Sequence, residues 1–199
     1  MSLPVVPPGI RLLGITGAPG VGKTTLAAAL GLPVVPMDGF HYADVELVRR
    51  GLLDRKGAPE TFDAEGYAAL LGRAHAGEEG VVAPMFERDL EQPLAGAIPV
   101  PATGTVVTEG NYLLLDEPRW RAVRAEIDVV WHVVVDDSLR LDRLVARHVE
   151  FGKSPDEAWA WVARVDQANA VRIEAARDRA DLVVDLTGWD EAPPRTPRA

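Results

Sequence analysis

The sequence contains no cysteine, and lysine occurs only at Lys23, Lys56 and Lys153 among its 21 basic residues. Without cysteine, disulfide bridges and thiolate metal sites are excluded, so we expect neither redox chemistry nor structural zinc. No apolar run approaches the roughly 18 residues that span a bilayer. Residues 1–8 also lack the basic start and apolar centre of a signal peptide. We therefore expect a cytoplasmic protein without membrane contact.

An excess of positive charge is also lacking. The formal charge is -9 and the pI is near 4.9, which argues against the broad basic surface that binds nucleic acid. The 47% of hydrophobic and 26% of charged residues are typical of a soluble globular protein. The length predicts one domain over residues 1–199, with disordered Pro-containing ends at 1–8 and 191–199. The sequence leaves open whether the chain forms a homodimer.

Short apolar runs alternate with helix-forming segments along the chain. We expect strands at 11–16, 32–37, 105–108, 129–135 and 182–185, and helices at 23–30, 45–50, 64–75, 138–149 and after Ser154. Ser154 and Glu157 form a capping box with Pro155 at the first helical position. Residues 51–61 contain Gly and Pro and are expected to be an exposed loop. The alternation predicts an α/β three-layer fold with a mostly parallel central sheet and a ligand site at the carboxyl ends of the strands.

A phosphate-binding motif lies between the first strand and the first helix. The pattern G-x-x-x-x-G-K-[ST] is matched by Gly17, Ala18, Pro19, Gly20, Val21, Gly22, Lys23 and Thr24. Backbone N–H groups of such a loop point at an anion, and the glycines let the chain approach it closely. Lys23 is expected to reach the β- and γ-phosphates of a nucleotide, and Thr24 to bind Mg²⁺. A chance Gly-rich turn is the alternative, which the flanking strand and helix disfavour.

Asp38 ends the second predicted strand, so we expect it at the same sheet edge as the phosphate loop. A carboxylate there can accept the proton of an acceptor hydroxyl and orient the attacking oxygen. The alternative is a structural role, in which Asp38 begins a turn with Gly39.

Glu109 follows the strand at 105–108 and is itself followed by Gly110 and Asn111. An acidic side chain at this edge can hold Mg²⁺ through water, and we expect both Glu109 and Asn111 close to the substrate. The alternative for Glu109 is a solvated carboxylate at a strand end.

Arg140, Arg143 and Arg147 have helical spacing and are predicted to share one helix face that can close over phosphates. We assign a catalytic role to Arg143 and Arg147 and leave Arg140 as a surface residue. The alternative is an exposed face paired with Asp142 or Glu150. Among the histidines, His41 follows Asp38 closely and is a candidate for substrate contact, whereas His132 lies in a strand and is expected in the core.

These motifs, in their order, resemble the superfamily of phosphoribulokinase, uridine kinase and pantothenate kinase. The resemblance runs from about residue 12 to 185 through GAPGVGKTT, PMDGFHYAD, RKGAPETFD and EGNYLLLD, followed by the RL..RH segment. It implies that Gly17 to Thr25 bind ATP and Mg²⁺, that Asp38 is the base, and that Arg143 and Arg147 belong to a small, mobile helical lid. RKGAPETFD is most similar to pantothenate kinase and implies a substrate-side role for Lys56 and Asp63.

The segment APMFERDLEQP departs from these families. Phe86, Glu87 and Arg88 replace the Tyr and His residues that pantothenate and uridine kinases carry near this point, so neither acceptor is carried over. The chain looks most like short bacterial relatives described as nucleoside or nucleotide kinases or fructose-transport kinases. Arg88, if it faces the cleft, favours an acceptor with a carboxylate or phosphate; the alternative is an ion pair with Glu87, Asp89 or Glu91.

The leading interpretation is an ATP-dependent kinase that phosphorylates a hydroxyl of a small molecule, with a pantothenate-, nucleoside- or sugar-like acceptor. A P-loop ATPase switch that acts on a protein partner is the alternative. A GTPase of the common kind is disfavoured because the sequence has no Asn-Lys-x-Asp tetrapeptide. A silent binding module is disfavoured by the joint presence of Lys23, Thr24, Asp38 and Glu109.

Overall fold

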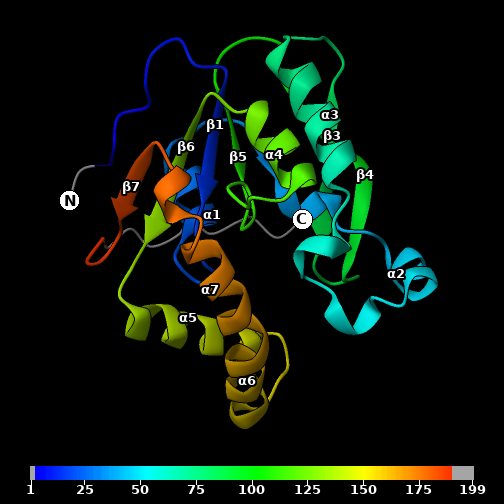
Figure 1. Ribbon diagram of the computed structural model, residues 1–199, viewed down its shortest axis with the longest axis vertical. Coiled ribbons are helices and arrows are strands. Elements are labelled where there is room, and N and C mark those ends of the chain that lie inside the picture. Colours follow the sequence, from blue (N-terminus) through cyan, green and yellow to red (C-terminus); the bar gives the residue numbers. More distant parts are fainter. Residues whose placement is uncertain (1–2, 190–199) are drawn as a thin grey trace.

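The computed structural model describes residues 3–189 and is built around a parallel β-sheet (Figure 1). The strands lie in the order β2-β5-β1-β6-β7, and each neighbouring pair runs parallel. Their bounds are β1 (Leu12–Thr16), β2 (Val34–Pro36), β5 (Val106–Glu109), β6 (Val129–Val134) and β7 (Leu182–Asp185). The predicted α/β fold with a mostly parallel sheet is therefore confirmed.

Side chains on the two faces of the sheet enter two separate hydrophobic clusters. On β1, Leu12 belongs to one cluster, whereas Leu13 and Ile15 belong to the other. The neighbouring Val106 and Val107 of β5 divide in the same way. Both faces are covered, which explains why the strands read as continuous apolar runs rather than as alternating patterns.

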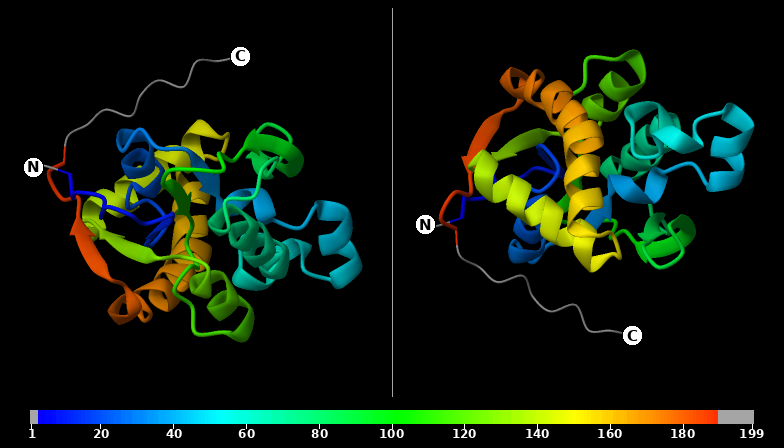
Figure 2. Two further views of the ribbon diagram at one scale, coloured as in Figure 1. Left: turned by 90° about the horizontal axis from the view of Figure 1, so that it is seen from above. Right: turned by 90° about the horizontal axis from the view of Figure 1, so that it is seen from below.

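Helices form the two outer layers (Figure 2). Helix α1 (Lys23–Ala29) packs on one cluster, and α3 (Ala64–His75) and α4 (Pro118–Ala125) pack on the other. The remaining helices are α2 (Asp44–Arg50), α5 (Asp137–Glu150), α6 (Pro155–Trp161) and α7 (Gln167–Glu174). The helices and the sheet thus make the three layers of the predicted fold.

Helices α5 and α6 lie beyond the carboxyl edge of the sheet, where the strand arrows end (Figure 1). Helix α6 begins with the predicted capping box: the Ser154 side chain accepts from the backbone N–H of Glu157, and the Glu157 side chain accepts from that of Ser154. A π-helical turn, Val162–Asp166, joins α6 to α7. This helical arm has the position that a lid over the sheet edge requires.

A two-stranded antiparallel hairpin, β3 (Val82–Glu87) and β4 (Gln92–Pro99), lies apart from the central sheet. The sequence did not predict it, because Pro84 and Pro93 interrupt the strand pattern. The hairpin packs on the 3₁₀ helix Met37–Phe40 that follows β2. A Cβ at Gly39 would lie 2.3 Å from the carbonyl oxygen of Pro84, so glycine permits this close approach.

Some predictions needed correction. The second strand is shorter than expected, because the chain turns into a 3₁₀ helix at Met37. Residues 51–61 are not simply an exposed loop: they contain two 3₁₀ turns, and Pro59 and Thr61 are buried. Residues 3–8 contain no helix or strand, yet Leu3 and Val6 pack against the core rather than forming a free end. The predicted tail at 191–199 lies outside the described residues.

Candidate active site

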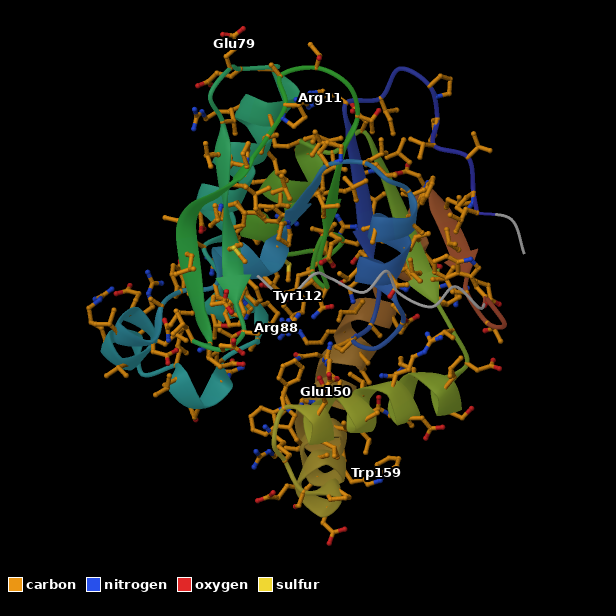
Figure 3. The ribbon with its side chains drawn as sticks, turned by 180° about the vertical axis from the view of Figure 1, so that it is seen from behind. Arg11, Glu79, Arg88, Tyr112, Glu150 and Trp159 are labelled. Carbon is orange, nitrogen blue, oxygen red and sulfur yellow. The ribbon has the colours of Figure 1, made fainter. Side chains whose placement is uncertain are left out.

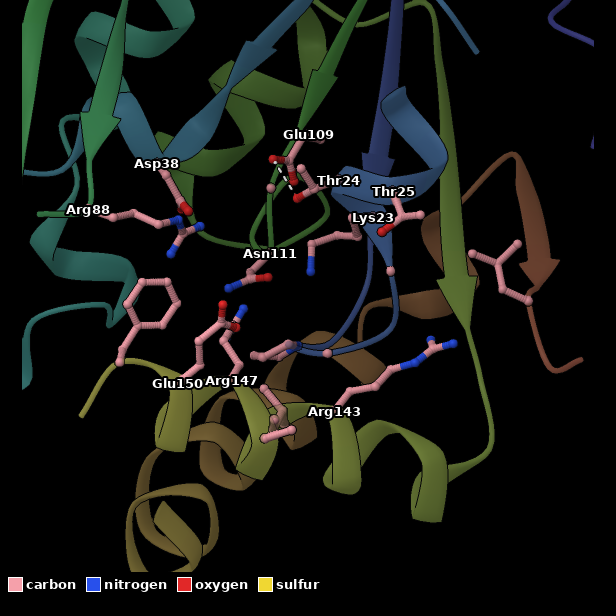
Figure 4. Close-up of a pocket in the computed structure, with 18 of the residues that line it drawn as sticks. Lys23, Thr24, Thr25, Asp38, Arg88, Glu109, Asn111, Arg143, Arg147 and Glu150 are labelled. Carbon is pink, nitrogen blue, oxygen red and sulfur yellow. Dashed lines mark hydrogen bonds between the residues drawn. The ribbon is translucent and has the colours of Figure 1, made fainter. Parts of the chain in front are cut away.

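A cavity of about 680 Å³ lies at the carboxyl edge of the sheet (Figure 4). It is formed by the phosphate loop, the ends of β2 and β5, helix α5 and the turn of the hairpin. The predicted site residues that line it are Pro19, Gly20, Gly22, Lys23, Thr24, Thr25, Asp38, Arg88, Glu109, Asn111, Arg143 and Arg147. Segments that are far apart in the sequence therefore converge on one site.

The phosphate loop is shaped by glycine and by close backbone contacts. Gly17 has a φ of 146°, and a Cβ there would lie 2.4 Å from the carbonyl oxygen of Val133 on β6. Ala18 and Val21, also parts of the motif, have buried side chains in the hydrophobic core. They can serve an anion only through their backbone, as the loop geometry requires.

Lys23 is buried, and its ammonium group donates to the carbonyl oxygens of Gly17 at 2.9 Å and Ala18 at 3.0 Å. Burial lowers the pKa of Lys23 to about 8, against the opposing effect of the negative charges of Glu109 and Asp38. The two carbonyl oxygens are the hydrogen-bond partners of the ammonium group, and they hold this positive charge within the loop, where it can bind phosphate oxygens.

Thr24 and Glu109 bring two oxygen groups together beside the loop. The Thr24 hydroxyl donates to Oε1 of Glu109 at 3.2 Å, as the dashed line in Figure 4 shows. Burial, together with the charge of Asp38, raises the pKa of Glu109 to about 7, while Lys23 opposes this shift. Oxygen donors of this kind fit Mg²⁺, which takes few protein ligands and completes its shell with water and phosphate. Within residues 3–189, no group of three or more His, Cys, Asp or Glu side chains could hold a metal alone.

Asp38 lies on the 3₁₀ helix that follows β2 and reaches the cavity from the side opposite the phosphate loop (Figure 4). Its negative charge opposes the lowering of the pKa of Lys23 and adds to the rise in the pKa of Glu109. A carboxylate at this point can accept a proton from a hydroxyl that enters the cavity.

Arg143 and Arg147 extend from α5 into the cavity, whereas Arg140 does not. The assignment of Arg140 to the surface was wrong: it is only 4% exposed. Its Nε donates to Asp137 at 3.0 Å, and its Nη2 bonds the amide oxygen of Gln167. Arg140 therefore faces Gln167 at the start of α7, and its ionic partner is Asp137 rather than Asp142 or Glu150.

Three predicted substrate-side residues lie outside the set that lines the cavity. His41 bonds the backbone oxygen of Asp38 through Nδ1 at 2.8 Å and packs between the rings of Phe62 and Phe86. Lys56 is paired with Asp44 at 2.7 Å. Asp63 caps α3 by accepting from the N–H of Gly66 at 3.0 Å.

Arg88, labelled in Figure 3, lines the cavity from the hairpin turn. Within residues 3–189 it forms no ion pair with Glu87, Asp89 or Glu91. Sequence reasoning did not assign seven of the lining residues to the site: Gly110, Leu144, Ala146, Glu150, Phe151, Leu186 and Trp189. Among these, Glu150 and Phe151 are neighbours in the sequence. Both lie at the end of α5, where an extension of the arginine spacing beyond Arg147 would have found Glu150.

His132 is buried as predicted, and its Nε2 lies 3.1 Å from Oε1 of Glu174. Its Nδ1 has no partner within residues 3–189. Burial lowers the pKa of His132 despite the opposing charge of Glu174. The residue lies in β6, away from the cavity, and belongs to the core.

The sheet order and the loop after β1 define the class of protein as a P-loop nucleotide-binding α/β fold. A protein of Schizosaccharomyces pombe described as a "putative uridine kinase" is 31% identical over 192 residues, 87% of this chain and 82% of that protein. The pantothenate kinase of Limosilactobacillus reuteri is 32% identical over 142 residues, 63% of this chain and 44% of that protein. No family model matches the chain.

A crystal structure of a "putative fructose transport system kinase" from Silicibacter sp. TM1040 shares 44% identity and a TM-score of 0.77, covering 89% of this chain and 91% of that one. The chain belongs to the P-loop kinase superfamily that includes phosphoribulokinase, uridine kinase and pantothenate kinase. This membership supports a small-molecule P-loop kinase, a class that generally uses ATP and Mg²⁺. Within residues 3–189, no helix is long and apolar enough to cross a membrane.

Proposed function

We propose that the protein transfers the γ-phosphate of ATP to a hydroxyl group of a small molecule. The observation that carries this proposal is the convergence of a phosphate loop, a carboxylate and two arginines on one cavity, with Lys23 and Asp38 on opposite sides of it. A kinase needs this separation, because the donor phosphate and the acceptor hydroxyl must approach each other from opposite directions.

Asp38 is the proposed base. It accepts the proton of the acceptor hydroxyl while the hydroxyl oxygen forms its bond to the γ-phosphorus, and ADP leaves with the electrons of the broken phosphorus–oxygen bond. Asn111, which also lines the cavity, can donate or accept a hydrogen bond to the acceptor and so orient it.

On the donor side, the backbone of Gly17 to Thr25 and the ammonium group of Lys23 hold the phosphates. Thr24 and Glu109 would hold Mg²⁺, which supplies positive charge that offsets the charge of the transition state. Arg143 and Arg147, which line the cavity from α5, would add guanidinium groups, and we infer that this helix closes over the nucleotide and excludes water.

The candidate acceptors are pantothenate-like, nucleoside-like and sugar-like alcohols. The relatives named above support this range, but their acceptors differ from one another. Of Phe86, Glu87 and Arg88, only Arg88 lines the cavity, and its position near Asp38 supports a role in selecting among these acceptors.

The test is ADP release from Mg·ATP with pantothenate, uridine, cytidine, fructose, other sugars and ribulose 5-phosphate, each compared with no acceptor. Lys23→Ala and Asp38→Asn are the active-site variants. Asp54→Asn, at an exposed position outside the cavity lining, is the matched control for Asp38. We expect release that depends on one acceptor, that is lost in both active-site variants and that persists in the control.

Equal release with every acceptor and with none, surviving Asp38→Asn, would contradict the proposal. That result would favour the alternative of a P-loop ATPase switch, because such a protein hydrolyses nucleotide without an acceptor whereas a closed kinase excludes water.

A further inference from the structure

The hairpin turn carries a guanidinium group that the nucleotide chemistry does not use. Arg88 is the first residue after β3, and its side chain points into the cavity on the same side as Asp38 (Figure 4). Within residues 3–189 it makes no ion pair and no side-chain hydrogen bond. A fork of five N–H donors is therefore directed at the cavity, and no ion pair takes up its hydrogen bonds.

The surroundings of Arg88 are charged and aromatic: Arg147, the carboxylates of Asp38, Glu109 and Glu150, and Phe151 line the same cavity. Desolvation has the largest effect in lowering the pKa of Arg147, and the like charge of Arg88 adds to it through repulsion, whereas the charges of Asp166 and Asp38 oppose it. The Cζ atom of Arg88 lies 6.0 Å from the ring centroid of Phe151. An anionic group between the two arginines would relieve the repulsion and accept hydrogen bonds from both.

The turn that carries Arg88 is fixed in place from outside the cavity. Lys56 binds Asp44 at 2.7 Å and also donates to the backbone oxygen of Glu91, at the far end of the turn. The Gln92 side chain accepts from the backbone N–H of Asp44 at 3.0 Å. Two connections to α2 therefore hold the turn, and Lys56 is a positioning residue for Arg88.

The position of Arg88 assigns it to the acceptor rather than to the nucleotide. The hairpin packs on the 3₁₀ helix that contains Asp38, with Gly39 against Pro84, so Asp38 and Arg88 lie on elements that contact each other directly. Lys23, Thr25 and Arg143 lie on the opposite side of the cavity (Figure 4). A molecule whose hydroxyl lies at Asp38 therefore also lies close to Arg88.

From these contacts we propose that the acceptor is an anionic alcohol whose carboxylate or phosphate group is bound by Arg88, with Lys56 holding the turn in place. The inference rests on the proposed kinase function and deepens it by naming the chemical class of the acceptor. A carboxylate and a phosphate monoester both match an arginine fork.

The experiment compares acceptors in matched pairs that differ in the anionic group. The pairs are D-glycerate with glycerol, D-gluconate with D-glucose, and fructose 6-phosphate with fructose, so that carboxylates and phosphates are tested separately. We expect kcat/KM for the anionic member of the productive pair to exceed that for the neutral member by at least about tenfold.

The variants are Arg88→Gln, Arg88→Lys and Arg49→Gln. Arg88→Gln should lower kcat/KM for the anionic acceptor by about 10- to 100-fold, mainly through KM, and Arg88→Lys should restore part of it. Arg49, whose side chain is 70% exposed and pairs with Glu46, is the matched control for loss of one positive charge. Affinity for Mg·ATP should be the same in all four proteins.

The failures of the two proposals are distinguishable. Acceptor-dependent turnover in which neutral members serve equally well, with no effect of Arg88→Gln, would overturn the anionic acceptor and leave the kinase standing. If no pair supports turnover, the anionic members are titrated calorimetrically into protein loaded with Mg·ADP. Binding that Arg88→Gln abolishes supports the inference, and absent or unchanged binding overturns it.

Discussion

The two sides of the cavity are built differently. The nucleotide side is one continuous segment, Gly17 to Thr25, whose shape depends on glycine and on contact with β6. The acceptor side joins Asp38 to a hairpin some fifty residues later, through Gly39 and Pro84, and is fixed by Lys56. The first side binds with its backbone, and the second with side chains on separate elements. Backbone geometry tolerates change poorly, whereas side chains on a separate hairpin can be altered one at a time.

The largest effect is expected from breaking the nucleotide side at Gly17. In Gly17→Ala the new Cβ would lie 2.4 Å from the Val133 carbonyl oxygen, at a φ of 146° that L residues rarely adopt. We expect a loss of about 3 kcal/mol or more in the free energy of unfolding, and loss of ATP binding. Urea unfolding and calorimetric titration with ATP measure these effects.

Gly31→Ala is the matched control, since Gly31 has a φ of 65° with no heavy atom within 4 Å of the added Cβ. It should cost only about 1–2 kcal/mol, from backbone strain alone, and leave ATP affinity intact. Equal losses in the two variants would show that the contact with β6 does not shape the loop.

Breaking the acceptor side at Gly39 should give a smaller and more selective effect. The Cβ of Gly39→Ala would lie 2.3 Å from the Pro84 carbonyl oxygen and would push the hairpin away from Asp38. We expect kcat/KM for the acceptor to fall by about 10²-fold, because misplacement by about 1 Å has this effect on a reacting pair. Affinity for ATP, measured by titration, should change little; a parallel loss of ATP binding would contradict the division into two sides.

Lys56→Met tests the acceptor side alone, because it removes the side chain that holds the hairpin turn and changes no residue that lines the cavity. Without the bonds to Asp44 and to the backbone of Glu91, the turn that carries Arg88 loses its fixed position. We expect an approximately tenfold rise in KM for the acceptor, with kcat and ATP affinity nearly unchanged. Steady-state kinetics with each substrate varied measures this. A fall in kcat alone would instead indicate that Lys56 contacts the reacting groups.

The smallest effect is expected at His132, outside both sides. Burial lowers the pKa of His132 in the folded protein below its ordinary value of 6.5. At a pH between the folded and the unfolded pKa, the unfolded chain therefore binds more protons than the folded one. Stability should therefore fall as the pH drops below about 6.5, by no more than about 1.4 kcal/mol per pH unit from this residue. His132→Asn should reduce that slope in urea unfolding, with kinetics at neutral pH unaltered. An unchanged slope would mean that His132 does not titrate on unfolding.

The difference between one continuous segment and contacts among separate elements also explains which features could be predicted from the sequence. The loop, β7 and α3 were predictable, because a contiguous motif and local periodicity define them. The hairpin was not, because Pro84 and Pro93 obscure its strands and its position depends on a contact with Gly39. Arg140 was assigned to the surface because helical spacing identifies a face of α5 but not the contact with Gln167 of α7. The proximity of Arg88 to Asp38 likewise depends on tertiary packing and could not be predicted from local sequence patterns.

In the sequence, the hairpin lies between α3 and β5. Within residues 3–189, it pairs with no strand of the central sheet. Its replacement would leave every hydrogen bond of that sheet in place. The insertion can thus diverge in length and sequence while the phosphate loop stays constant, which makes it the natural place for new acceptor preferences to evolve. Grafting β3 and β4 between members of this superfamily would be a direct route to exchange what they phosphorylate.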